Sequence, residues 1–112
     1  IDAACLTLMG KRGQFTKPAT VDGPLAFDNA YSLEAARQKG IESEVAGQAD
    51  IFMVQDITSG NLLYKALTYV AQLSIAGVVV GASCPIILTS RADSAPSKLN
   101  AIALACQALA GS

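Results

Sequence analysis

The chain has 112 residues, of which 52% are apolar and 15% are charged, and its formal net charge is −1. This composition argues against a disordered tail, and the lack of any basic run argues against a nucleic-acid partner. No apolar stretch reaches the ~20 residues of a membrane span, so no membrane partner is expected. The charged share is low for a free-standing domain. It indicates surface buried against another domain or subunit, or a piece of a larger protein.

The chain contains no histidine and three cysteines. The absence of histidine removes Ser-His-Asp and Cys-His catalysis and any His-containing zinc site. A catalytic base must then be Asp, Glu, Lys, Tyr or Cys. Cys5, Cys84 and Cys106 are widely separated and form no C-x-x-C pair. We therefore expect buried thiols in a reducing compartment, and a cytoplasmic location.

The N-terminal half predicts two helices. Residues 2–12 carry apolar side chains at helical spacing, and Gly13 would end this helix. A short strand is expected to close at Val21. Ser32 is placed to cap a second helix that runs to about Lys39, with Gly40 just beyond its end.

The C-terminal half predicts three strands and two helices. A buried strand is expected at Ile51–Val54, and Ser59-Gly60-Asn61 offers helix-start chemistry. The β-branched runs 78–80 and 85–88 are separated by four residues, which suits a hairpin and an antiparallel pair. A last helix is expected over 95–109, capped by Asp93 or Ser94. The residues predicted to be buried are Leu62, Leu63, Ala66, Leu67, Val70 and Leu73 on the first helix and Leu99, Ile102, Cys106 and Leu109 on the second.

The order of these elements, with helices and strands interleaved along the chain, indicates a layered α/β fold. The periodic segments do not repeat a common sequence, which argues against a solenoid.

The stretch TSRADS lies where the apolar run PIIL ends and the last helix begins. Open α/β sheets bind ligands at this edge, and a helix N-terminus adds free backbone N–H groups. Arg91 offers a planar fork for phosphate oxygens, and Ser90 a hydroxyl donor. Asp93 could act as a base or cap the helix. If this is a site, the Arg91 guanidinium points into a cavity near Asn61 and Lys65; the alternative is a solvated turn with one exposed arginine.

The stretch SGNLLYK places a second polar set on a helix. Asn61 and Lys65 are four residues apart and share a helix face. With Tyr64 they could form a polar edge above a ligand. The alternative is a capped helix with a solvated lysine.

Three stretches, VDGPLAFDNA, GQADIFMVQDITSGNLLYKAL and PIILTSRADSAPSKLNAIALA, resemble the C-terminal part of the phosphate acetyl/butyryl transferases, and phosphate butyryltransferases most. The resemblance extends over nearly the whole chain, with the motifs in the family's order. It implies an enzyme that catalyses the reversible reaction of acyl phosphate with coenzyme A to give acyl-CoA and phosphate. Coenzyme A is then a substrate, and no metal or other cofactor is implied.

The resemblance also implies an isocitrate/isopropylmalate dehydrogenase-like architecture, with two layered αβα domains around a cleft, usually in a homodimer. Residues 1–93 would form most of the second domain, incomplete, and residues 94–112 the C-terminal helix that returns to the first domain. The N-terminal domain would be absent, and the isolated segment nearly inactive. Two alternatives stay open: a non-catalytic anion-binding or dimerisation module, and an inactive proteolytic remnant of the same fold.

The resemblance assigns catalytic roles at the TSRADS stretch. The family's Ser-Arg pair falls on Ser90 and Arg91, which implies transition-state stabilisation by the serine and phosphate binding by the arginine. Phosphotransacetylases place an Asp base seven residues after the motif serine, where this chain has Ser97. Asp93 is the nearest carboxylate and is our candidate base.

The family's Gly-Asn-x-x-Tyr-Lys pattern falls on Gly60, Asn61, Tyr64 and Lys65. The resemblance implies that these residues line the cleft and bind substrate. Phosphotransacetylases carry an arginine four residues after the motif lysine, where this chain has Tyr69. Phosphate binding is then expected to be built differently here, or by another part of the protein.

Overall fold

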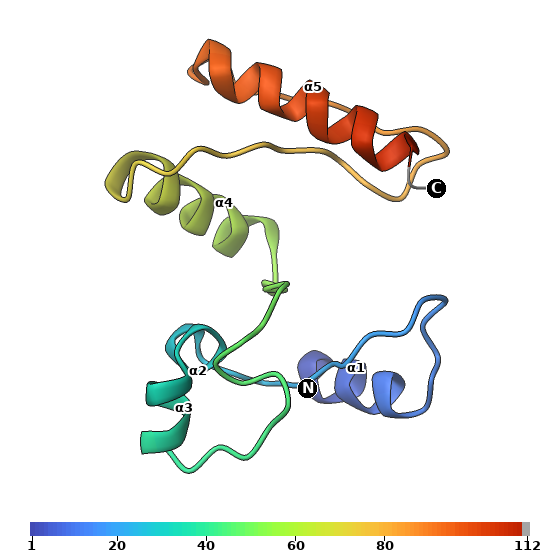
Figure 1. Cartoon of the computed structure of the whole chain (residues 1–112), viewed down its shortest axis with the longest axis vertical. Coiled ribbons are helices and arrows are strands. Elements are labelled where there is room, and N and C mark those ends of the chain that lie inside the picture. Colours follow the sequence, from blue (N-terminus) through green and yellow to red (C-terminus); the bar gives the residue numbers. More distant parts are fainter. Residues whose placement is uncertain (111–112) are drawn as a thin grey trace. The chain divides into compact units, whose positions relative to one another are not determined.

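The computed structural model describes residues 1–110, and the chain divides into two compact units, Ile1–Met53 and Val54–Ser112. Regular structure in both units is helical (Figure 1). The first unit holds α1 (Asp2–Lys11), α2 (Phe27–Tyr31) and α3 (Leu33–Gln38), and the second holds α4 (Ile57–Lys65), the π-helix η1 (Ala66–Val70) and α5 (Ala95–Ala110).

The first predicted helix is confirmed as α1. Lys11 lies in its last turn, where a cation complements the helix dipole, and Gly13 follows at a φ of 64°. The chain after α1 returns to pack on it at Gly10, where an added Cβ would lie 3.0 Å from Val21 Cβ. The short strand expected at Val21 is not formed, since this residue packs against the helix without a β partner.

The second predicted helix is also confirmed, as α3. The Ser32 hydroxyl accepts a hydrogen bond from the Ala35 backbone N–H at 3.3 Å, which satisfies one free donor of the first turn. Gly40 follows the helix at a φ of 64°. The preceding helix α2 is only five residues long and was not predicted, because so short a segment shows no apolar periodicity.

The loop after α3 is fastened to α2 by two backbone hydrogen bonds. The Gly47 N–H donates to the Asn29 carbonyl at 2.7 Å, and the Ala49 N–H donates to the Ala30 carbonyl at 3.2 Å. Gly47 has a φ of 80°, and a Cβ at this position would overlap the backbone of Leu33. Glycine is therefore required here for both its conformation and its size.

Among residues 1–110 no strand forms, and the strand predicted at Ile51–Val54 is wrong. The runs 78–80 and 85–88 do pair in the antiparallel sense, but through a single bridge between Val79 and Ile86. The Val79 N–H donates at 2.8 Å and the Ile86 N–H donates back at 3.4 Å. A strand needs a neighbour for its backbone groups, and residues 51–54 have no bridge partner in the described chain. The layered αβα sheet stays a prediction.

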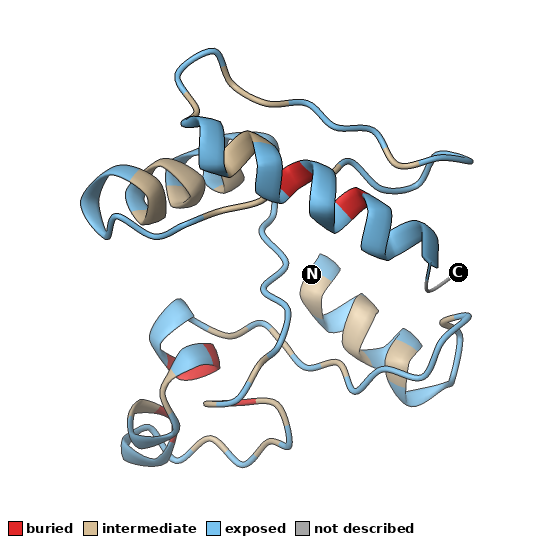
Figure 2. Ribbon diagram, turned by 45° about the horizontal axis from the view of Figure 1, so that its top comes forward, coloured by how far each residue is buried: buried red, intermediate tan, exposed pale blue. Residues whose placement is uncertain are grey.

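Burial corrects the predicted apolar stripes. Leu62 on α4 is 72% exposed and Leu99 on α5 is 65% exposed. On α5 the buried face is instead formed by Ala101 and Ala105, one helical turn apart, and Leu99 lies on the opposite side. Figure 2 shows how few residues are buried in the described chain. The predicted buried thiols are also wrong, because all three cysteines are exposed: Cys5, Cys84 and Cys106.

None of the helices in the described chain combines the length and the hydropathy that crossing a bilayer requires.

Candidate functional site

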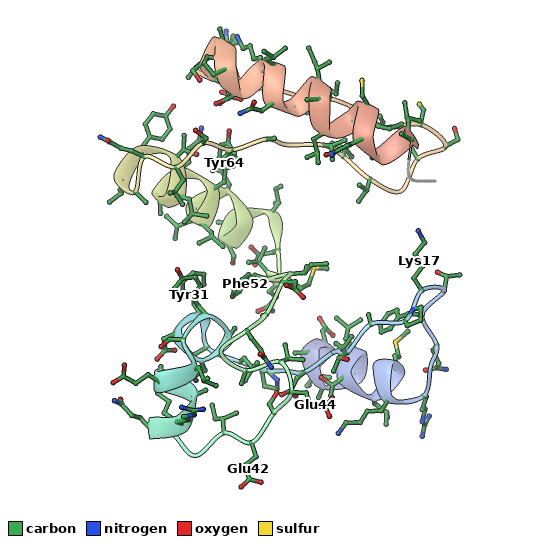
Figure 3. All side chains as sticks on the ribbon, viewed as in Figure 1. Lys17, Tyr31, Glu42, Glu44, Phe52 and Tyr64 are labelled. Atoms are coloured by element: carbon green, nitrogen blue, oxygen red, sulfur yellow. The ribbon has the colours of Figure 1, made fainter. Side chains whose placement is uncertain are left out.

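The second unit contains a pocket of about 400 Å³. Its walls come from α4, from the extended segment that follows η1, from the turn before α5 and from the first half of α5. In Figure 3 Tyr64 projects from α4 toward the segment that leads to α5. A volume of this size is within the range of small-molecule sites. The polar residues of the wall are Asn61, Tyr64, Lys65, Thr89, Ser90, Asp93 and Ser97.

Five of the six predicted site residues line this one pocket, although they come from stretches more than 20 residues apart in sequence. The sixth, Arg91, is exposed and does not line it. The prediction that its guanidinium points into this cavity is therefore wrong. The Asp93 N–H donates to the Ser90 carbonyl at 3.1 Å, which closes a tight turn. Residue 91 is the second residue of that turn, and it is exposed.

Helix α4 holds Asn61, Tyr64 and Lys65, and it begins earlier than predicted. Asp56 caps it: its Oδ1 accepts a hydrogen bond from the Ser59 N–H at 2.7 Å. That hydrogen bond holds the pKa of the Asp56 carboxyl below its usual value. The helix begins at Ile57 and not at the predicted Ser59. The Asp56 carboxylate is the better cap, because its negative charge lies at the positive end of the helix dipole.

Asp93 organises the turn before α5. Its Oδ2 accepts a hydrogen bond from the Ser90 backbone N–H at 2.7 Å, and its Oδ1 accepts one from the Tyr64 hydroxyl at 3.1 Å. The helix cap is Ser94, whose Oγ accepts from the Ser97 N–H at 3.3 Å. Of the two candidate caps, Asp93 and Ser94, the structure thus selects the serine. Asp93 is left facing the pocket.

Tyr64 links α4 to this turn. Burial and the hydrogen bond to the Asp93 carboxylate raise the pKa of the Tyr64 hydroxyl, burial being the larger cause. The phenol therefore stays protonated at neutral pH and remains a donor to Asp93. The contact joins residues 29 positions apart and ties the Ser90 turn to α4.

Lys65 is held by aromatic rings. Its ammonium nitrogen lies 5.3 Å from the centroid of the Tyr64 ring and 5.3 Å from that of the Tyr69 ring. Both distances are within the range of a cation–π interaction. No carboxylate of residues 1–110 lies within ion-pair distance of this ammonium. The pocket thus combines an unpaired cation, hydroxyl donors and one carboxylate, a set that can bind an anion and accept a proton.

Three polar residues of this site were not assigned a role from the sequence, and one of them, Thr89, lines the pocket. Ser97 lines the pocket, and its hydroxyl lies 3.0 Å from that of Ser94. Tyr69 contacts Lys65 from η1. The four-residue spacing of Lys65 and Tyr69 was the available signal, since such pairs share a helix face.

A pocket of this make-up, on the carboxyl side of an apolar run and against a helix start, is typical of proteins that bind small anionic ligands. The family model described as "Phosphate acetyl/butaryl transferase" matches residues 6–106. The chain belongs to this family.

Proteins named as phosphate butyryltransferases and phosphate acetyltransferases are similar to the chain over most of its length. The chain is 54% identical to the phosphate butyryltransferase of Clostridium acetobutylicum over 94% of its own length and 35% of that protein's. It is 61% identical to the phosphate acetyltransferase of Rickettsia felis over 83% of its length and 26% of that protein's. The crystal structure of a branched-chain phosphotransacylase from Enterococcus faecalis V583 matches with a TM-score of 0.74 and 38% identity, covering 90% of this chain and 38% of that one. The chain spans about a third or less of the length of these curated relatives.

Proposed function

We propose that the polypeptide carrying this chain is a phosphate acyltransferase, which moves an acyl group such as acetyl or butyryl between phosphate and coenzyme A. One observation carries the proposal. Family membership converges with a pocket that brings Asn61, Lys65, Ser90 and Asp93 together from two distant stretches. The substrates are an acyl phosphate with coenzyme A, or acyl-CoA with phosphate. A pocket of about 400 Å³ suits the reacting end of these molecules rather than a whole coenzyme.

In the proposed mechanism Asp93 accepts the proton of the coenzyme A thiol, because the thiolate is the nucleophile. The sulfur then attacks the acyl carbonyl carbon, and the bond from that carbon to the phosphate oxygen breaks. Asp93 has both carboxylate oxygens hydrogen-bonded, to Tyr64 and to Ser90. Each oxygen keeps a second lone pair, so one lone pair can still receive the proton.

The Ser90 hydroxyl is proposed to donate to the oxyanion that forms on the carbonyl oxygen. The Ser90 backbone N–H is not free for this task, because it donates to Asp93 at 2.7 Å. Lys65 is proposed to hold the phosphate in the pocket, and Asn61 and Tyr64 to bind substrate beside it. Phosphate binding by Arg91 stays a prediction of the family resemblance, because its side chain is exposed and does not line the pocket.

The wider expectations belong to the same proposal. We propose the layered αβα, isocitrate/isopropylmalate dehydrogenase-like architecture, supported by the likeness to the Enterococcus phosphotransacylase. In it residues 1–93 belong to the second domain, and the segment 94–112 returns to the first through α5; residues 111–112 lie outside the described part of the chain. A homodimer in the cytoplasm, with no metal and no further cofactor, completes the proposal.

A second candidate is a non-catalytic anion-binding module. The exposure of Arg91 and the two hydrogen bonds that already occupy Asp93 favour it. Under this candidate the pocket binds phosphate without turnover, and Asp93 serves only to close the turn.

The test is a thiol-release assay with acyl-CoA and phosphate, on the natural polypeptide expressed over its whole reading frame. Ser90→Ala is expected to lower kcat about 10²- to 10³-fold, as for the loss of one oxyanion donor. The matched control is Ser83→Ala, in the exposed loop between the two paired runs. Equal activity of the two variants would refute the role of Ser90. Phosphate binding without any turnover in the wild type would favour the non-catalytic module.

Asp93→Asn separates the base from the turn. The amide oxygen can still accept one hydrogen bond, but the amide cannot act as a base. A base role therefore predicts a loss of about 10²- to 10⁴-fold in kcat and the disappearance of the acidic limb of the pH–rate profile. A loss whose pH profile keeps its wild-type shape would show that Asp93 acts only by closing the turn.

A further inference from the structure

Lys65 is the one cationic side chain among the residues that line the pocket, and Asp93 is the one carboxylate. Opposite charges that share a small pocket attract each other, and an ion pair between them would consume the positive charge that an anionic ligand needs. No such pair forms among residues 1–110.

Two tyrosines contact these two charged groups. The Tyr64 hydroxyl donates to Asp93 Oδ1 at 3.1 Å, while the face of the same ring receives the Lys65 ammonium at 5.3 Å. The Tyr69 ring receives the same ammonium, also at 5.3 Å. Ring faces attract a cation without neutralising it, so Lys65 is oriented and keeps its full charge.

Tyr69 is held in place by the backbone rather than by the pocket. It lies in η1, the π-helical continuation of α4, where the Ala71 N–H donates to the Ala66 carbonyl at 3.0 Å. Its own side chain is 56% exposed and does not line the pocket. The ring therefore contacts Lys65 while Tyr69 itself stays more than half exposed.

We propose that Tyr69 is a positioning residue, which with the Tyr64 ring holds the Lys65 ammonium apart from Asp93 and presents it to a phosphate group of the substrate. This inference rests on the proposed function for the identity of the ligand. The phosphate group is that of an acyl phosphate or inorganic phosphate, or one carried by coenzyme A. Tyr69 acts only through Lys65 and touches no reacting atom.

The test compares Tyr69→Leu, which removes the ring, with Tyr69→Phe, which keeps it, in the natural polypeptide expressed over its whole reading frame. The control is Tyr31→Leu, at a 70% exposed tyrosine that stacks on Phe27 and not on a cation. Calorimetric titrations with inorganic phosphate and, separately, with coenzyme A measure binding without requiring turnover. We expect Tyr69→Leu to weaken one of these affinities about two- to fivefold, as one exposed cation–π contact implies. Tyr69→Phe and Tyr31→Leu are expected to retain it.

The second measurement is the NMR shift of the Lys65 ε-methylene in lysine-labelled protein, assigned by its loss in Lys65→Arg. Ring currents are expected to move this signal upfield in the wild type and in Tyr69→Phe, and less so in Tyr69→Leu. If the affinity for only one of the two ligands falls in Tyr69→Leu, that ligand carries the phosphate group that the Lys65 ammonium binds. Unchanged affinity for both ligands in Tyr69→Leu, or an unshifted methylene in the wild type, would overturn the inference. Tyr69-dependent phosphate binding in a protein that transfers no acyl group would leave this inference standing and overturn the proposed function instead.

Discussion

The hydrogen bond from Tyr64 to Asp93 gives the sharpest prediction for the site. Tyr64→Phe removes the hydroxyl that donates to Asp93 Oδ1 at 3.1 Å and keeps the ring under Lys65. Hydrogen bonds to charged groups contribute about 1.5–3 kcal/mol when buried. This one is only part-buried, and water can replace the lost donor. We therefore expect a loss of about 1 kcal/mol in unfolding free energy at pH 7, which is about fivefold in the folding equilibrium.

The effect has a defined pH dependence. The pKa of Tyr64 is raised in the folded state, by burial first and then by Asp93. A group with a raised pKa contributes stability that is fully present below its unfolded pKa, about 10, and is lost as the pH rises through the folded value. The difference between wild type and Tyr64→Phe should thus be constant from pH 7 to 9 and shrink at higher pH.

Urea unfolding between pH 7 and 11 measures this difference. Tyr31→Phe is the control, because that hydroxyl makes no hydrogen bond within residues 1–110 and its removal should change little at any pH. A stability difference for Tyr64→Phe that is the same at pH 7 and pH 11 would refute the account of this contact.

Three further predictions concern local structure. Asp56→Ala should destabilise α4 while Asp56→Asn, which keeps a cap, should do so less. Because the pKa of Asp56 is lowered, its contribution is present above about pH 3.8 and disappears as the pH falls through the folded value, which acid unfolding series will detect. Gly47→Ala should lower the free energy of unfolding in urea by about 1–3 kcal/mol, because the φ of residue 47 is 80° and an added Cβ would meet the Leu33 backbone. Gly77→Ala is the control, since an added Cβ there has open space. Similar losses for the two variants would contradict this prediction. All three cysteines should react with a thiol reagent without denaturant, and fewer than three equivalents would contradict their exposure.

Local chemistry made several elements predictable from the sequence. The end of α1 shortly before Gly13 and the cap of α3 at Ser32 depend on residues within one turn of each helix terminus. The antiparallel sense of the Val79–Ile86 bridge follows from a four-residue connection. Five of the six site residues could be assigned to one pocket because two separated motifs carried the resemblance.

Only the tertiary structure decided the rest, because the missing information is about partners distant in sequence. Residues 51–54 have strand composition, but a strand also needs a neighbouring backbone, and none bridges to it in residues 1–110. Helix α5 carries leucines and alanines on different faces, and packing, not periodicity, chose the face of Ala101. Arg91 is exposed in the Ser90–Asp93 turn, to which the Tyr64 hydroxyl donates from 29 residues away. Side-chain direction at such a turn depends on contacts that no local spacing encodes.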